Sequence, residues 1–136
     1  METEQNLALN QDYLETVDLF MKLPFNTALT GYKMLVTATV LALNNTKPVL
    51  NLYKDIYEVV AEKYSINAKC VEKSIRGVIT SISNYCAVYN DLEFPNTLIK
   101  NAVKEARPKA FICSICNYIK FKRYQENYLK KNNSKD

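Results

Sequence analysis

The segment 52–82 constrains the fold of this chain more than any other, because it contains two apolar patterns at helical spacing separated by a short break. The break lies at residues 64–66. Asn67 then stands where a helix N-cap is expected, since its side-chain oxygen can accept a hydrogen bond from a free backbone N–H of the first turn. The segment therefore predicts two helices joined by a tight turn, with the second helix at residues 68–85.

The second of these helices has one apolar and one polar face. The apolar face consists of Val71, Ile75, Val78, Ile79, Ile82 and Tyr85. The polar face carries Lys69, Glu72, Lys73, Arg76 and Thr80. In a helix-turn-helix, the second helix lies in the major groove of DNA, and residues near its N-terminus contact the edges of the bases. The backbone N–H groups at that end also favour binding of a phosphate. We therefore expect these five polar residues to bind DNA, although a surface helix with a solvated polar face has the same pattern.

Helical spacing of apolar residues recurs along most of the chain, whereas the alternation typical of strands never runs far. Only two glycines and four prolines are present, so long loops are not expected. The predicted fold class is all-α, a compact multi-helix domain of about six helices with an extra N-terminal helix. Outside the helix-turn-helix, helices are expected at 7–22, 31–44, 97–107 and 111–128, and Pro48 is expected to open a short helix or turn.

We expect three parts along the chain. Residues 1–22 are an N-terminal helical extension, residues 23–128 the helix-turn-helix domain, and residues 129–136 a disordered basic tail. The helix at 7–22 has an apolar stripe formed by Tyr13, Leu14, Val17, Phe20 and Met21. Such a stripe packs either on its own domain or on a partner molecule.

Basic residues are concentrated in the second half of the chain. Residues 1–68 hold five basic and eight acidic side chains, whereas residues 69–136 hold thirteen basic and six acidic side chains. This asymmetry favours a basic surface on the predicted second helix and the segments after it, as in proteins that bind nucleic acid. No apolar segment approaches the length of a membrane span, and the N-terminus lacks the form of a signal peptide.

Metal-binding and enzymatic functions are not favoured. The chain has no histidine, so a zinc site would need the thiolates of Cys70, Cys86, Cys113 and Cys116. Cys70 and Cys86 are about four turns apart on one predicted helix and cannot converge on one ion. The C-x-x-C pair at 113–116 lacks the strand-then-helix setting of a redox dithiol. We therefore expect Cys113 and Cys116 to be small side chains of the core. We also expect that the protein binds no metal and no cofactor and is not an enzyme.

Four segments resemble one known family in the correct order. AKCVEKSIRGVI (68–79) is similar to that family's A-S-R-V-E-R-A-I-R-H-A-I. TGYKMLVTAT (30–39), LYKDIYEVVAEKYSI (52–66) and ARPKAFICSICNYIK (106–120) are similar to its other helices. The family is the C-terminal DNA-binding domain of the master sporulation response regulator of bacilli and clostridia. The resemblance implies a sequence-specific transcription regulator that reads the major groove of double-stranded DNA with helix 68–85.

The chain departs from the family pattern at three positions of this helix. Cys70 replaces a base-reading Arg, and Gly77 replaces a His beside the DNA backbone. Lys73 replaces an Arg, which keeps the charge but loses the planar fork that grips guanine. We expect these changes to alter the target sequence more than DNA binding itself. The alternative is a degenerate relative that acts as a protein-interaction module and modulates a full-length regulator.

Family members normally carry an N-terminal receiver domain, which would need about a hundred further residues. The chain is then either an excised fragment or a stand-alone relative without a receiver, and Met1 together with the helix-like N-terminal extension favours the second. A homodimer or a protein partner is then expected through helix 7–22. The expected location is the cytoplasm, in association with the nucleoid.

Overall fold

The computed structural model describes residues 4–47, 50–89 and 93–133. Every regular element among them is helical, which confirms the predicted all-α class. In chain order they are α1 (Glu4–Phe20), α2 (Thr30–Leu43), the π-helical segment η1 (Leu52–Tyr57), α3 (Glu58–Tyr64), α4 (Ala68–Val88), α5 (Thr97–Lys104) and α6 (Pro108–Asn133). No helix in the described ranges is both long and apolar enough to span a membrane.

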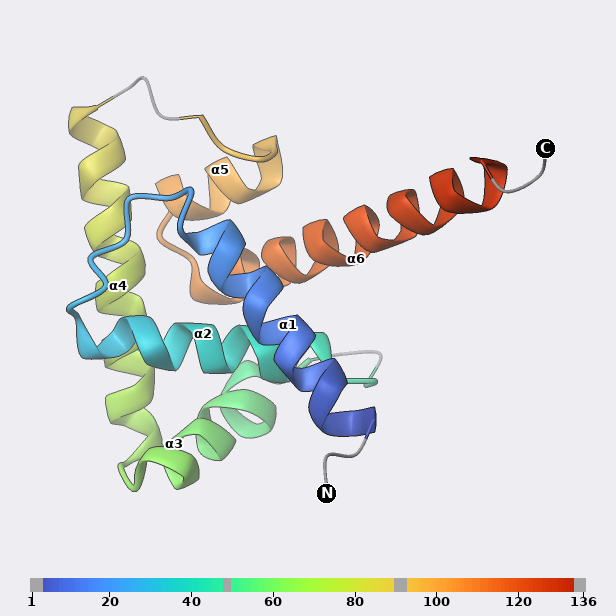
Figure 1. The fold of residues 1–136 in the computed structure, drawn as a ribbon. Coiled ribbons are helices and arrows are strands. Elements are labelled where there is room, and N and C mark those ends of the chain that lie inside the picture. The colour runs from blue at the N-terminus through green and yellow to red at the C-terminus, as the bar shows by residue number, and fades with distance from the viewer. Residues whose placement is uncertain (1–3, 48–49, 90–92, 134–136) are drawn as a thin grey trace.

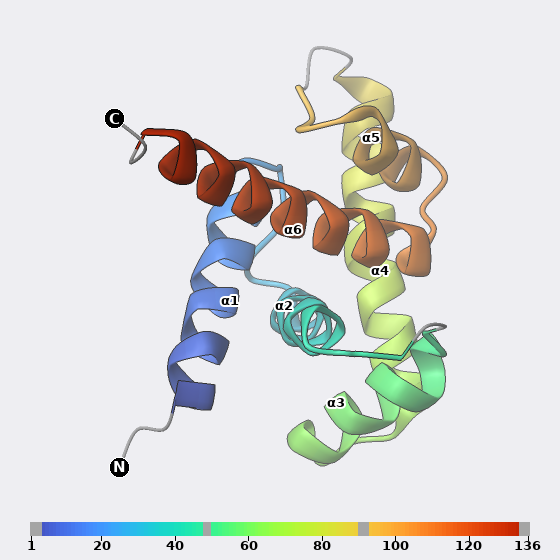
Figure 2. The ribbon, with the colours of Figure 1, turned by 90° about the vertical axis from the view of Figure 1, so that its right-hand side faces the viewer.

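Helix α2 is the centre of the fold. Figure 2 views it nearly end-on, with α1, α6, α4 and the η1–α3 segment arranged around it. Its buried residues lie on several sides of the helix and are Gly31, Tyr32, Met34, Leu35, Val36, Ala38, Thr39 and Ala42. A helix that is apolar nearly all round is stable only when neighbours cover it.

Gly31 allows α2 to lie directly against α4. A Cβ atom at this position would stand 2.2 Å from the backbone oxygen of Ser74 and 2.7 Å from a methyl carbon of Val78. Contacts between heavy atoms at such distances are strongly repulsive, so only glycine fits without a shift of the two helices. The close approach fixes α4 across the first turn of α2 (Figure 1).

The helix-turn-helix forms as the sequence predicts. Helix α3 ends at Tyr64, and the next residue, Ser65, adopts the left-handed conformation with φ of 54°. The side chain of Asn67 accepts a hydrogen bond from the backbone N–H of Lys69 at 2.7 Å, which confirms Asn67 as the N-cap of α4. Helix α4 continues to Val88, three residues beyond the predicted end at residue 85.

The apolar face of α4 is confirmed except at its end. Val71, Ile75, Val78, Ile79 and Ile82 are at most 2% exposed. Tyr85 is 41% exposed, so its assignment to the buried face was wrong. Its ring packs instead against the ring of Tyr89, with a centroid distance of 4.5 Å.

The face by which α1 packs differs from the predicted stripe. Of the five stripe residues only Phe20 is buried, while Tyr13, Leu14 and Met21 are exposed and Val17 is partly buried. The buried face consists of Asp12, Thr16, Leu19 and Phe20. Two of these residues are polar, and an apolar pattern cannot identify a face that polar side chains share.

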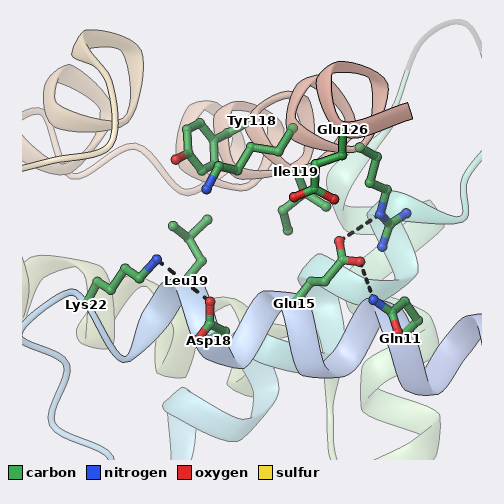
Figure 3. Close-up of a pocket in the computed structure, with 10 residues that line it drawn as sticks. Gln11, Glu15, Asp18, Leu19, Lys22, Tyr118, Ile119 and Glu126 are labelled. Carbon is green, nitrogen blue, oxygen red and sulfur yellow. Dashed lines mark hydrogen bonds and ion pairs between the residues drawn. The ribbon is translucent and has the colours of Figure 1, made fainter. Parts of the chain in front are cut away.

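Polar interactions explain why Asp12 is buried on α1. The guanidinium of Arg123 on α6 donates to Asp12 Oδ1 at 2.5 Å and to Glu15 Oε2 at 2.7 Å. The side chain of Asn44, at the end of α2, donates to the other oxygen of Asp12 at 2.7 Å. Burial alone would lower the pKa of Arg123, but the hydrogen bonds to Glu15 and Asp12 outweigh it and raise that pKa. The cluster therefore joins α1, α2 and α6. Figure 3 shows Glu15 between Gln11 and α6.

The C-terminal region differs from the predicted bounds. Helix α5 ends at Lys104, short of the predicted end at residue 107. Helix α6 starts at Pro108 and continues to Asn133, so residues 129–133 are helical where the sequence predicts a disordered tail. Residues 134–136 and the predicted element start at Pro48 lie outside the described residues. The second half of α6 runs away from α4 (Figure 1).

Candidate nucleic-acid interface

All five predicted DNA-binding residues lie on the side of α4 opposite its buried face. Lys69, Lys73, Arg76 and Thr80 are exposed, and Glu72 is partly buried. Their spacing of three and four residues places them along one stripe of the helix. This stripe, Lys69 to Thr80, is called the polar stripe below.

An ion pair crosses the polar stripe. The guanidinium of Arg76 lies 2.6 Å from a carboxylate oxygen of Glu72, one helical turn earlier. Among the described residues, neither Lys69 nor Lys73 has an acidic side chain within ion-pair distance. The two lysines therefore supply the uncompensated positive charge of the stripe, while Glu72 and Arg76 neutralise each other.

The N-terminal turn of α4 adds to this positive potential. It contains no acidic residue, and its backbone N–H groups carry the positive end of the helix dipole. Cys70 is exposed in this turn, so the position at which the resembling family has an arginine faces solvent. A thiol offers neither charge nor strong donors there.

Tyr57 is a buried residue that interacts electrostatically with both members of this ion pair, and the sequence pattern did not indicate it. Its side chain is 3% exposed, and within the described residues its hydroxyl has no hydrogen-bond partner. Burial is the largest cause that raises the pKa of Tyr57, the Glu72 carboxylate adds to the rise, and Arg76 opposes it, so that the pKa lies at about 12. The phenol is therefore neutral at physiological pH. Tyr57 belongs to the π-helical segment η1, and the apolar pattern of the sequence did not predict that its side chain is buried.

The starts of two other helices flank the polar stripe. On one side, Leu29, Thr30 and Gly31 of the α2 start line a groove together with Lys73, Ser74, Gly77 and Val78. On the other side, the start of α6 lines a groove with Arg76. An added Cβ at Gly77 would have no neighbour within 4 Å, so packing does not require a glycine at this position. The absence of a side chain at Gly77 leaves the first groove open.

The four cysteines are spread over the fold. Cys70 is exposed, Cys113 is partly exposed, and Cys86 and Cys116 are buried. Burial, with a smaller contribution from the neighbouring Cys113, raises the pKa of the Cys116 thiol to about 12. A thiol with such a pKa is unreactive at neutral pH. In the part of the chain that the structure describes, no three His, Cys, Asp or Glu side chains are placed to hold a metal ion.

Comparison with protein families adds a direct observation to this geometry. The family model described as "Sporulation initiation factor Spo0A C terminal" matches residues 16–119, which is most of the chain. The chain belongs to this family. No curated protein and no solved structure matches the chain. The match to the Spo0A C-terminal family begins within α1 and ends within α6, so it contains the whole helix-turn-helix.

Membership in the Spo0A C-terminal family confirms the resemblance drawn from the sequence. The family is the effector domain of a sporulation regulator, so membership supports a DNA-binding, effector-domain-like function. The family is one of regulatory DNA-binding domains and not a family of enzymes.

Proposed function

We propose that this protein is a sequence-specific transcription regulator that inserts α4 into the major groove of double-stranded DNA. The observation that carries the proposal is the polar stripe, exposed on the N-terminal half of α4 and held by a capped helix-turn-helix. Membership in the Spo0A C-terminal family supports the same function. We place the protein in the cytoplasm, in association with the nucleoid.

Roles along the polar stripe follow from the chemistry of each side chain. Glu72 accepts a hydrogen bond from a cytosine amino group, and Lys73 donates to guanine. Lys69 and Arg76 contact phosphates, and Thr80 extends the contact surface toward the middle of α4. Arg76 reaches a phosphate only when it exchanges or shares its ion-pair partner Glu72.

Binding to duplex DNA is expected to weaken steeply as salt rises. Each phosphate that a cationic side chain neutralises releases counterions, so log affinity falls linearly with log salt concentration. Electrophoretic mobility-shift titrations on promoter fragments at two salt concentrations measure this slope. Absence of any shifted complex at low salt would rule out the regulator function.

The two lysines of the polar stripe are expected to differ in what they contribute. Lys73→Ala should cost about 1–3 kcal/mol on the preferred site and reduce discrimination against random DNA. Lys69→Ala should weaken preferred and random sequences by similar factors, because phosphates carry no sequence information. Affinities of both variants on both duplexes test the assignment, and equal losses for the two variants on both DNAs would contradict it.

The alternative function is a protein-interaction module that modulates a full-length regulator, and the exposed apolar residues of α1 are the surface that it would use. Tyr13 is 53%, Leu14 63% and Met21 75% exposed, on a helix whose other face is already packed. This surface suits a second copy of the chain or a protein partner that needs no DNA. Solution mass measured with and without DNA separates this function from the regulator function, since a pure interaction module associates without DNA.

A further inference from the structure

Two residues at the start of α6 place positive charge beside the reader helix α4. Arg107 and Lys109 line one groove together with Arg76, Ala106, Pro108, Ala110 and Cys113. Figure 2 shows the start of α6 beside α4. Because Arg76 belongs both to the polar stripe and to this groove, the two surfaces are continuous.

The backbone holds the start of α6 in this place. Ala106 adopts a left-handed conformation with φ of 50°, which ends α5 and turns the chain. The N–H of Arg107 donates to the carbonyl of Ala102 at 3.1 Å, and the N–H of Phe111 donates to the carbonyl of Arg107 at 2.9 Å. Phe111 is fully buried, so the first turn of α6 is anchored in the core.

The charge of this groove is mostly uncompensated. Lys109 has no acidic side chain within ion-pair distance in the described ranges. Arg107 pairs with Glu105 at 3.0 Å, but both side chains are more than half exposed, and such surface pairs are weak. An adjoining groove shares Lys109 and adds Lys120 and Lys47, the last paired with Asp55.

The position of this groove fits the geometry of a helix in the major groove. The sugar–phosphate backbones form the two walls of the major groove, so side chains beside such a helix face phosphates. Contacts from outside the reader helix to those phosphates fix the protein's register on the duplex. The N–H groups at the start of α6 also favour an anion, in addition to the cationic side chains.

We propose that the groove between α4 and the start of α6 binds the DNA backbone that flanks the bases read by α4, with Lys109 and Arg107 contacting phosphates. This inference rests on the proposed function and deepens it. It assigns part of the DNA affinity to residues outside the helix-turn-helix and assigns no sequence preference to them.

The test compares Lys109→Ala and Arg107→Ala with Lys100→Ala in the intact chain. Lys100 is an exposed lysine that lines a different groove with Glu93 and Asn96, so its loss removes the same charge elsewhere. The probes are a duplex selected by the wild-type protein from a random library and the same duplex with neutral methylphosphonates at the flanking phosphates. Thermal unfolding of each variant verifies that it is folded.

Lys109→Ala and Arg107→Ala are each expected to weaken binding on the natural duplex, by equal factors on selected and random sequences. One lost phosphate contact lowers the salt slope by about 0.9, so the ratio of wild-type to variant affinity should shrink about 3.5-fold between about 50 and 200 mM salt. On the methylphosphonate duplex, the difference between wild type and these variants should disappear. Lys100→Ala should match the wild type on both probes.

If Lys109→Ala and Arg107→Ala behave like Lys100→Ala while the wild type binds DNA, the inference is wrong and the proposed function stands. If their losses persist on the methylphosphonate duplex, the two residues act by long-range charge, and the groove is not a phosphate site. If the wild type itself binds no duplex, the proposed function fails, and this inference fails with it.

Discussion

Phe20→Ala is expected to destabilise the protein by about 3–5 kcal/mol, because the variant leaves a large cavity where α1 meets the core. Phe20 is 1% exposed, and its ring lies 4.9 Å from that of Phe25 and 5.8 Å from that of Phe111, between centroids. The next residue, Met21, is 75% exposed and serves as a matched control. Met21→Ala should change stability by less than about 0.5 kcal/mol. Urea unfolding followed by circular dichroism measures both changes.

The Phe20→Ala and Met21→Ala variants show whether α1 can be deleted in experiments on dimerisation. If Phe20→Ala unfolds at the same urea concentration as the wild type, α1 does not belong to the core. If the expected difference appears, deleting residues 1–22 would remove core side chains, and any loss of DNA binding would then report unfolding. Tyr13→Ser and Met21→Ser, at exposed positions, are the appropriate variants for measuring self-association through α1.

The two glycines of the chain are expected to respond in opposite directions to the same substitution. Gly31→Ala should cost about 3 kcal/mol or more, because the new Cβ would overlap the carbonyl oxygen of Ser74, a backbone atom that cannot move alone. Gly77→Ala should stabilise the protein by about 0.5–1 kcal/mol, because the site is open and alanine restricts the unfolded chain. Thermal and urea unfolding of both variants provide the comparison.

Equal stabilities for Gly31→Ala and the wild type would show that α2 and α4 are not in close contact at this point. A destabilised Gly77→Ala would show that the groove beside the α2 start is closed. Since Gly77 borders the polar stripe, its alanine variant is a test of folding only, and its DNA affinity is a separate measurement.

The apolar face of α4 could be predicted from the sequence because its residues recur at strict helical spacing and no polar residue interrupts them. The packed face of α1 could not be predicted, since Asp12 is buried through Asn44 and Arg123, which are distant in sequence. The same limit applies to the start of α6. The sequence predicts a break at residues 108–110, but Ala106 adopts a left-handed conformation that its residue type does not favour, so the chain turns earlier than predicted.

The sequence predicted the polar face of α4 but not how the charges on that face pair. The i, i+4 spacing of Glu72 and Arg76 favours an ion pair on a helix, whereas both side chains were predicted only to bind DNA. Arg107 and Lys109 lie far from α4 in sequence, and only the folded chain brings them beside Arg76.

The Glu72–Arg76 pair affects how long the proposed regulator stays bound to DNA sequences other than its target. In the proposed complex, Arg76 would turn to a phosphate, and Glu72 would then face the base edges without its partner. A cytosine amino group at the right position would compensate for this loss, whereas other bases would leave the carboxylate repelled by the phosphates on both sides of the groove. Complexes on other sequences should therefore dissociate faster, so Glu72 would shorten each unproductive stop while the protein searches the chromosome for its site.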